Sequence, residues 1–295
     1  MNQPGFLLKD NEIGHYSGYR TRVSARYFFE LTSEDDLPKL MEIYAYARTQ
    51  DLRLLIISWG TNILFATDIF EWIIIKNSLV WWEYNEEEKI LHAFSNESIW
   101  QIAESLENQY NNPLWHRFIG LPGSIGWALY GNAGCFGLET ESNFSRASVY
   151  DMSEWKRKNL SKDEMQFTYR YSVLKRHPEY FLVWACFDLS EKIEKYPSDV
   201  DNISFREHKQ PKGNSCGSFW KNPSREVSAG QLIESVGLKW YRHGWAYWSD
   251  LHANFLMSDD ETCKGRDLYE LIELTRKKVK EEKGITLENE VKIII

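Results

Sequence analysis

A glycine-rich stretch, GLPGSIGWALYGNAGCFG at residues 120–137, has the spacing of a loop that binds a phosphate. Gly120, Gly123 and Gly126 allow tight turns and let backbone N–H groups approach an anion closely. The same residues would also suit an ordinary surface loop, which is the alternative explanation of this stretch taken alone. Trp127 is unexpected here, because a large indole stands beside the most permissive part of the backbone.

Three further motifs carry side chains that could act on a substrate. TYRYS (168–172) contains Arg170, CGSFWKNP (216–223) contains Ser218, and LENEV (287–291) contains Glu288 and Glu290. A guanidinium can stabilise developing negative charge, and a hydroxyl or carboxyl group can assist proton transfer. Each motif also has a simpler explanation. Arg170 could be an arginine at the edge of the core, and Ser218 lies in no G-x-S-x-G elbow. The two glutamates could lie on a solvated strand.

Composition narrows the classes of function. With 35 basic and 43 acidic residues among 295, the chain has a net charge of −8, which argues against a dedicated nucleic-acid binder. Its apolar runs, such as FEWIII and LVWWEY, are far shorter than the roughly 20 residues that span a bilayer. No signal peptide is indicated, the cysteines form no CxxC pair and the histidines form no HxxxH pair. We therefore expect a cytoplasmic protein with reduced thiols, no membrane or nucleic-acid partner and no metal.

The elements that must position these motifs alternate between helix and strand in the first half of the chain. Apolar residues recur with helical spacing over 33–50, where Ser33 is the expected N-cap. Short apolar runs predict strands at 53–58, 70–77, within 78–94, and at 180–190. A helix is expected from about Glu97 to Gln109, directly before the glycine-rich loop.

A change in composition separates the second half. Residues 191–217 are polar and contain two prolines, which favours a domain boundary near 190–200. Helices are expected at 224–237 and 265–284, the second ended by Gly284 in a left-handed cap, and a terminal strand at 285–295. The face of the last helix that we expect to be buried consists of Leu268, Leu271, Ile272, Thr275 and Val279. The fold class is therefore α+β, or mixed α/β, with at least two domains.

Taken together and in order, six motifs are a more specific signal than any one of them alone. They are SWGTN at 58–62, the stretch at 120–137, YRYS at 169–172, GSFWKNP at 217–223, HANF at 252–255 and LENEV at 287–291. The series resembles the family of UDP-N-acetylenolpyruvoylglucosamine reductase, also called UDP-N-acetylmuramate dehydrogenase, over nearly the whole chain. The short stretch between YRYS and GSFWKNP is similar to compact members of the family, which lack an extra substrate-covering loop.

This resemblance implies a fold with two parts. An FAD-binding region at 1–190, of the PCMH or vanillyl-alcohol-oxidase type, would consist of two α/β subdomains at about 1–78 and 79–190. A C-terminal α/β domain at 191–295 would bind the substrate. The resemblance further implies a monomer that takes part in peptidoglycan precursor synthesis.

The resemblance also implies a reaction and its catalytic residues. Hydride would pass from NADPH through FAD to the vinyl carbon of UDP-N-acetylglucosamine enolpyruvate, which would become UDP-N-acetylmuramate. Arg170 matches the family's arginine that stabilises the enolate, and Ser218 matches its proton donor. Glu290 matches the carboxylate that assists the enolate oxygen, with Glu288 as the alternative.

Binding residues follow from the same resemblance. Lys209 and Asn222 match positions that contact the sugar nucleotide and its diphosphate. The SWGTN motif follows a predicted strand, as a turn that cradles a pyrophosphate should. The residues expected to contact FAD are Gly60, Thr61, Asn62, Gly123, Ser124, Ile125, Gly126, Asn132 and Gly134. NADPH is expected to bind only transiently, since no GxGxxG motif indicates a separate dinucleotide site.

The chain departs from the family pattern mainly through tryptophan. The family has glycine where this chain has Trp59, Trp72, Trp127, Trp240 and Trp245, and Trp155 and Trp184 are two further candidates. Indoles at positions of close approach would occupy space that the FAD phosphates need, and overpacking costs roughly 1–3 kcal/mol per site. Two smaller departures, Tyr171 for a usual aspartate and Cys216 for a common alanine, remove no reacting group.

The tryptophans leave alternatives open. One hypothesis is that the gene reads the UGA codon as glycine, so that these positions are glycines written as tryptophan. The alternative is a divergent, flavin-free relative that binds a sugar nucleotide without catalysis. A further alternative, another FAD oxidoreductase of the same fold with a different acid as substrate, would lack the GSF and LENEV motifs that this chain has.

Overall fold

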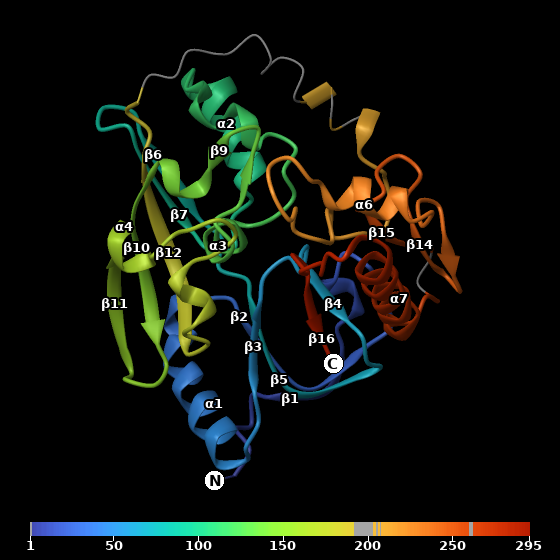
Figure 1. Ribbon diagram of the computed structural model, residues 1–295. Coiled ribbons are helices and arrows are strands. Elements are labelled where there is room, and N and C mark those ends of the chain that lie inside the picture. Colours follow the sequence, from blue (N-terminus) through green and yellow to red (C-terminus); the bar gives the residue numbers. More distant parts are fainter. Residues whose placement is uncertain (1, 192–202, 205, 207, 260–261) are drawn as a thin grey trace. The chain divides into compact units, whose positions relative to one another are not determined.

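The computed structural model of the chain describes residues 2–191, 203–204, 206, 208–259 and 262–295 (Figure 1). The chain forms two compact units. Unit 1 contains Met1–Lys9, Tyr27–Trp59 and Trp72–Ser204, and unit 2 contains Asp10–Arg26, Gly60–Glu71 and Phe205–Ile295. The predicted boundary at 190–200 falls mostly on residues outside the described ranges.

The N-terminal part of the chain forms a four-stranded sheet in the order β1-β2-β5-β3. Its strands are β1 (Leu8–Glu12), β2 (Ser24–Leu31), β3 (Leu54–Ile57) and β5 (Ile69–Asn77). Strands β3 and β5 are parallel, as their continuous apolar sequences favour. Helix α1 (Leu37–Thr49) connects β2 to β3, and its apolar face packs with β2 and β5 in one hydrophobic core.

A five-stranded antiparallel sheet in the order β11-β10-β12-β7-β6 forms the rest of unit 1. Its strands are β6 (Trp82–Asn85), β7 (Ile90–Phe94), β10 (Phe144–Asp151), β11 (Lys156–Ser161) and β12 (Tyr180–Asp188). Helices α2 (Ile99–Tyr110) and α3 (Ile125–Tyr130), green in Figure 1, share a core with one face of this sheet. Part of the opposite face joins the core around α1.

Shorter elements complete unit 1. They are η2 (Glu34–Asp36), η3 (Pro113–Phe118), β8 (Gly134–Cys135), β9 (Leu138–Glu139), η4 (Thr140–Ser142), α4 (Lys162–Met165) and η5 (Val173–Lys175). Strands β8 and β9 pair with each other directly after the glycine-rich segment. The segment from Gly134 to Ser142 therefore folds back beside α3, with which η4 is in contact.

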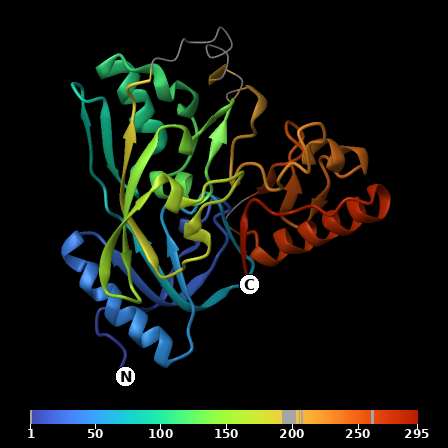
Figure 2. The same cartoon turned by 60° about the vertical axis from the view of Figure 1, so that its left-hand side comes forward.

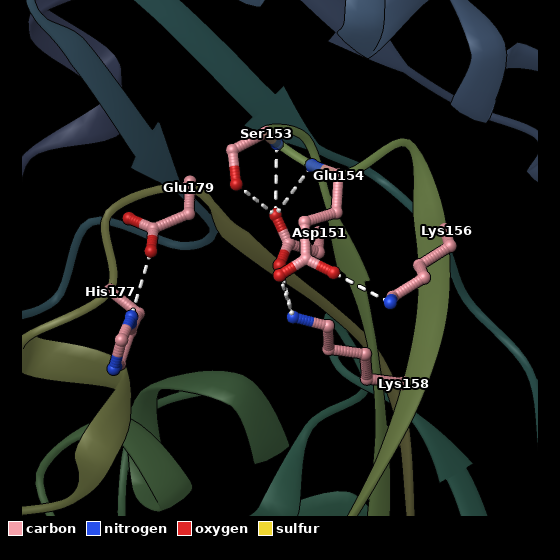
Figure 3. A network of polar contacts seen from close by, with 7 residues as sticks. All are labelled: Asp151, Ser153, Glu154, Lys156, Lys158, His177 and Glu179. Carbon is pink, nitrogen blue, oxygen red and sulfur yellow. Dashed lines mark hydrogen bonds and ion pairs between the residues drawn. The ribbon is translucent and has the colours of Figure 1, made fainter.

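A network of polar contacts closes the hairpin between β10 and β11 (Figure 3). The buried carboxylate of Asp151 accepts hydrogen bonds from the Ser153 hydroxyl at 2.6 Å and from Nζ of Lys158 at 2.6 Å. Nζ of Lys158 also donates to Glu154 at 2.8 Å. Trp155 ends the hairpin loop with a φ of 61°, in the left-handed region.

Unit 2 has a separate core built from both ends of the chain. Its elements are η1 (Gly14–Tyr16), β4 (Ile63–Phe65), α6 (Ala229–Ser235), β13 (Arg242–His243), β14 (Ala246–Trp248), β15 (Leu256–Ser258), α7 (Gly265–Lys283) and β16 (Lys292–Ile294). Strand β16 pairs in parallel with β4, and β13, β14 and β15 form a small antiparallel sheet. Figure 2 shows the red helix α7 lying along the orange segment that contains this sheet, with which it shares the core.

Most of the predicted elements are confirmed. Helix α1, strands β3, β5, β6, β7 and β12, and helices α2, α6 and α7 lie within the predicted ranges or within two residues of them. Helix α7 buries the whole expected face and ends at Gly284, whose φ is 71°. Ser33 caps the short helix η2, which leads into α1.

Two predictions of local structure are wrong. The stretch at 120–137 is more than a loop, because Ser124 caps the short helix α3 by accepting a hydrogen bond from the N–H of Trp127. The terminal strand is only Lys292–Ile294. Glu288 and Glu290 therefore lie outside this strand, because the main chain around them bonds to the segment after Ser218.

Candidate active site

Arg170 lies in a tight turn of unit 1. The N–H of Tyr171 donates to the carbonyl of Thr168 at 3.0 Å, and the N–H of Thr168 donates to the carbonyl of Tyr171 at 3.2 Å. Between them Arg170 has a φ of 56°, in the left-handed region that side-chain-bearing residues rarely adopt. Such outliers persist only where their surroundings hold them, and they gather at functional sites.

The guanidinium of Arg170 contacts the glycine-rich segment. It donates to the carbonyl of Asn132 at 3.5 Å and to the carbonyl of Gly134 at 3.4 Å, both at the long end of the hydrogen-bond range. Nζ of Lys175 donates to the carbonyl of Arg170 itself at 2.6 Å. The guanidinium thus gives this turn a positive charge.

Ser218 and Glu290 are brought together in unit 2. The carbonyl of Phe219, the residue after Ser218, accepts a hydrogen bond from the N–H of Glu290 at 2.8 Å. Ser218 itself forms an isolated antiparallel bridge with Phe255. Three motifs that are far apart in the sequence, GSFWKNP, HANF and LENEV, therefore lie side by side in the fold.

Asn254 holds the segment of Ser218, although the sequence analysis assigns it no role beyond its place in HANF. Its buried amide accepts from the N–H of Trp220 at 3.0 Å and donates to the carbonyl of Trp220 at 2.9 Å. The N–H of Phe219 donates to the carbonyl of Asn254 at 2.8 Å. The signal that could have found it is a polar amide between two apolar residues of a motif, Ala253 and Phe255.

Gly60 and Asn62 have structural roles in the turn after β3. Gly60 has a φ of 68°, and a Cβ there would lie 1.5 Å from the carbonyl oxygen of Tyr16, so the backbone requires glycine. The amide of Asn62 donates to the carbonyl of Glu290 at 3.1 Å, and its own carbonyl accepts from the N–H of Lys292 at 3.0 Å. The GTN residues and LENEV are thus joined within unit 2.

Thr61 tests whether this turn suits the FAD that the sequence predicts. Within the described part of the chain, its Oγ1 is buried and has no hydrogen-bond partner. An unsatisfied buried hydroxyl costs about 1–3 kcal/mol, and a phosphate oxygen would remove that cost. The turn therefore fits a bound pyrophosphate group.

Main-chain N–H groups of the glycine-rich segment are used inside the fold. The N–H of Ile125 donates to the carbonyl of Glu97 at 2.8 Å, and that of Gly126 donates to the carbonyl of Ser95 at 2.7 Å. Ser124 uses its hydroxyl to cap α3. The contacts of these residues with FAD stay a prediction.

Trp127 packs over Gly123. A Cβ at Gly123, which has a φ of 145°, would lie 2.5 Å from Cε3 of the indole. The indole therefore fills the space directly beside one of the predicted phosphate-binding glycines. The indole N–H of Trp59 donates to the carbonyl of Asn96 at 3.1 Å.

The two residues predicted to bind the sugar nucleotide lie in unit 2 with Ser218 and Glu290. The side-chain oxygen of Asn222 accepts from the N–H of Ala229, the first residue of α6, at 3.0 Å. Lys209 is exposed. Their contacts with a substrate stay a prediction.

Burial changes the acidity of two groups beside predicted site residues. Burial raises the pKa of Cys216 to about 12, so its thiol stays protonated near neutral pH and is no nucleophile. Burial and a hydrogen bond with Glu141 raise the pKa of Glu139, a residue of β9 that pairs with Gly134 of β8.

In the described ranges no helix combines the length and apolar composition needed to cross a membrane. The same ranges contain no group of three or more His, Cys, Asp or Glu side chains that could hold a metal.

The fold is that of a known α+β reductase. A crystal structure of UDP-N-acetylenolpyruvylglucosamine reductase (MurB) from Thermus caldophilus aligns with a TM-score of 0.74 at 20% sequence identity, covering 98% of this chain and all of that one. A family model for the C-terminal domain of UDP-N-acetylenolpyruvoylglucosamine reductase matches residues 209–294.

Sequence comparison gives the family. A protein named UDP-N-acetylenolpyruvoylglucosamine reductase from Chloroflexus aurantiacus is 31% identical over 99% of this chain and 98% of its own length. The protein of that name from Chlamydia trachomatis serovar L2 is 31% identical over 96% of this chain and 94% of its own length. The chain belongs to the UDP-N-acetylenolpyruvoylglucosamine reductase family. This confirms the family and the α+β fold class that the motifs predict.

Proposed function

We propose that this chain reduces the enolpyruvyl ether of UDP-N-acetylglucosamine enolpyruvate to UDP-N-acetylmuramate, with NADPH as reductant, in peptidoglycan precursor synthesis. The observation that carries the proposal is the pairing of the Ser218 segment with Glu290 through the Phe219 carbonyl. It places the main-chain segments that carry Ser218 and Glu290 side by side, in a chain that belongs to the reductase family.

The family uses FAD, and the chain has residues that fit it. Thr61, with its unsatisfied hydroxyl, would bind the pyrophosphate, beside Gly60 and Asn62. Gly123 to Gly126 and Gly134 are further residues that the sequence assigns to the cofactor, and Asn132, whose side chain bonds within the protein, would contribute through its main chain. When bound there, the flavin would supply the hydride-transfer chemistry between NADPH and the vinyl carbon of the substrate.

Arg170 stabilises the charge that hydride addition creates. Addition to the vinyl carbon places negative charge on an enolate conjugated with the substrate carboxylate. A guanidinium held by its surroundings stabilises such charge without reorganising, which is the main source of rate enhancement in reactions of this kind. The clamped, left-handed turn of Arg170 provides that rigidity.

Ser218 supplies the proton that completes the lactyl ether. Its Oγ donates to the substrate carbon as the enolate collapses, and the basicity of the enolate compensates for the weak acidity of a hydroxyl. Glu290 assists at the enolate oxygen, and its N–H bond to Phe219 keeps it beside the serine segment. Lys209 and Asn222 bind the diphosphate and sugar of the nucleotide.

The partners and location follow the function. The chain takes a UDP-sugar as its substrate and NADPH as a transient co-substrate. We further propose that it acts in the cytoplasm, as a monomer, and without nucleic acid or metal.

Two half-reactions test the function separately. Purified protein should be yellow, and anaerobic NADPH should bleach the flavin absorbance in the parent chain and in Ser218→Ala alike. Ser218→Ala should then lose most of the enolpyruvyl reduction. Equal losses in both half-reactions would show that Ser218 supports folding or FAD binding instead. A colourless protein that still binds UDP-sugars would identify the flavin-free alternative.

A further inference from the structure

Asn132 makes an unusual set of contacts in the core of unit 1. Its side chain is fully buried and its φ is 41°. Its Nδ2 lies 3.0 Å from an oxygen of Glu139, 3.0 Å from an oxygen of Glu141, and 3.3 Å from the carbonyl of Thr168. Its Oδ1 accepts from the N–H of Glu141 at 3.1 Å. The amide, which has only two hydrogens, thus serves three acceptors within the protein itself.

The two carboxylates on this amide form a coupled pair. Burial and the hydrogen bond to Glu141 raise the pKa of Glu139, while the positive charge of Arg170 lowers it. The nearby carboxylate of Glu141 thus opposes the ionisation of Glu139, and the Asn132 amide that both contact keeps the two side chains in one place.

Asn132 also contacts both the backbone of the Arg170 turn and the Arg170 side chain. Its amide donates to Thr168, where the turn begins, and its own carbonyl accepts from the guanidinium of Arg170 at 3.5 Å. The second carbonyl on that guanidinium belongs to Gly134, which pairs with Glu139 in the two-stranded β8–β9 ribbon. One residue therefore connects the carboxylate pair, the turn and the charged head group.

The strained backbone of Arg170 needs such a clamp. A non-glycine residue in the left-handed region is held there only when neighbouring contacts outweigh the strain. The clamp is formed by Asn132 on Thr168 and by Lys175 on the carbonyl of Arg170.

We propose that Asn132, together with the Glu139–Glu141 pair, is a positioning device for the guanidinium of Arg170, and that the Asn132 side chain does not contact FAD. The inference rests on the proposed role of Arg170 in stabilising the enolate. Asn132 fixes the turn through Thr168 and holds the guanidinium through its own carbonyl, and the two carboxylates hold the Asn132 amide in place. Small displacements of a catalytic charge are costly: an error of about 1 Å reduces the rate by about 100-fold.

A double-mutant cycle tests the inference. Asn132→Ala should slow enolpyruvyl reduction by about 10-fold or more while flavin content, flavin reduction by NADPH and the substrate KM change less than about 2-fold. In an Arg170→Lys background the same change should cost less than about 2-fold, because the group it positions is already altered. If Asn132→Ala slows the reaction by the same factor with and without Arg170→Lys, the inference is wrong. It is also wrong if Asn132→Ala loses flavin in parallel with activity. Asn159→Ala, an exposed asparagine on β11, is the matched control.

A second variant and a second measurement keep the test decisive. If Asn132→Ala does not fold, Glu139→Gln replaces it in the same cycle, with the exposed Glu88→Gln as its control. Amide hydrogen exchange at Tyr171 reports the turn without any turnover, and Asn132→Ala should speed it by about 10-fold. If the unsubstituted protein forms no product, the proposed function is wrong. The positioning role of Asn132 is then judged from the exchange rate at Tyr171 alone. Unchanged exchange overturns it.

Discussion

Replacing Trp240 or Trp155 with glycine should stabilise the protein. Trp240 has a φ of 67° in a turn where the N–H of Tyr241 donates to the carbonyl of Leu238 at 3.0 Å. Trp155 has a φ of 61° at the end of the β10–β11 hairpin loop. Both are places where a turn favours glycine, and both indoles are exposed, at 63% and 58% of their surface.

The expected size follows from two opposing effects. The left-handed conformation costs a residue with a Cβ about 1–2 kcal/mol, which glycine avoids. Part of this gain in stability, about 0.5–1 kcal/mol, is lost because glycine loses more backbone freedom on folding. Each exposed indole loses little packing, so each substitution should raise the free energy of unfolding by about 0.5–1 kcal/mol.

Urea unfolding followed by far-ultraviolet circular dichroism measures the effect without relying on tryptophan fluorescence. The two variants report on different units, since Trp155 lies in unit 1 and Trp240 in unit 2. Trp100→Gly is the control. That indole is 41% exposed but lies in α2, where glycine should destabilise by about 0.5 kcal/mol. If all three midpoints fall together, the reasoning from backbone strain is wrong.

Three further predictions concern other residues. Burial opposes the ionisation of Asp151, but bonds from Lys158 and the turn after Asp151 hold its pKa at about 2. Its ionised form therefore stabilises the fold above pH about 4, by about 2 kcal/mol, and this is lost as the pH falls through about 2. Asp151→Asn should show a smaller acid-dependent fall in the free energy of unfolding, and an identical fall would refute this. Asn254→Ala should destabilise by about 2–4 kcal/mol in urea, because it leaves both main-chain groups of the buried Trp220 without partners; a change below about 1 kcal/mol contradicts that. Trp127→Gly should increase the flavin retained on purification, measured by absorbance at equal protein, and an unchanged ratio would show that the indole does not obstruct FAD.

Local signals explain which elements the sequence could predict. Helix α7 has a regular apolar face and a glycine directly after its last turn, so nothing distant is needed to define it. Helix α3 is not predicted because it is short and contains Gly126, which lowers helix propensity, while its stability comes from the Ser124 cap and from packing in the core of unit 1. The terminal strand was predicted too long because Glu290 bonds to Phe219 instead of continuing the pairing of β16.

In the candidate site, too, some features follow from local sequence signals and others depend on contacts between distant residues. Motif order identified Arg170, Ser218 and Glu290 as candidates, and the structure supplies what holds them. The Asn254 bonds to Trp220 and the Asn132 bonds to Glu139 join residues that carry no pattern of spacing between them. Contacts of this kind arise from the folded path of the chain, so a single sequence does not encode them in a form that periodicity can reveal.

Five of the tryptophans fall into two structural groups, and the difference between the groups makes the decoding hypothesis testable. Trp115 and Trp248 are fully buried, and their indole N–H groups donate to Asn143 at 3.2 Å and to Thr275 at 2.8 Å, as expected of true core tryptophans.

Trp155 and Trp240 instead occupy exposed left-handed positions, and Trp127 covers a glycine. If UGA is read as glycine, the gene should have UGG at codons 115 and 248 and UGA at codons 127, 155 and 240. Backbone strain and codon identity are independent observations, so their agreement would make Trp127 a glycine and leave the space beside Gly123 open for the cofactor. UGG at codons 127, 155 and 240 would make the indoles genuine, and the measured flavin content would then decide whether the chain is a working reductase or a flavin-free relative.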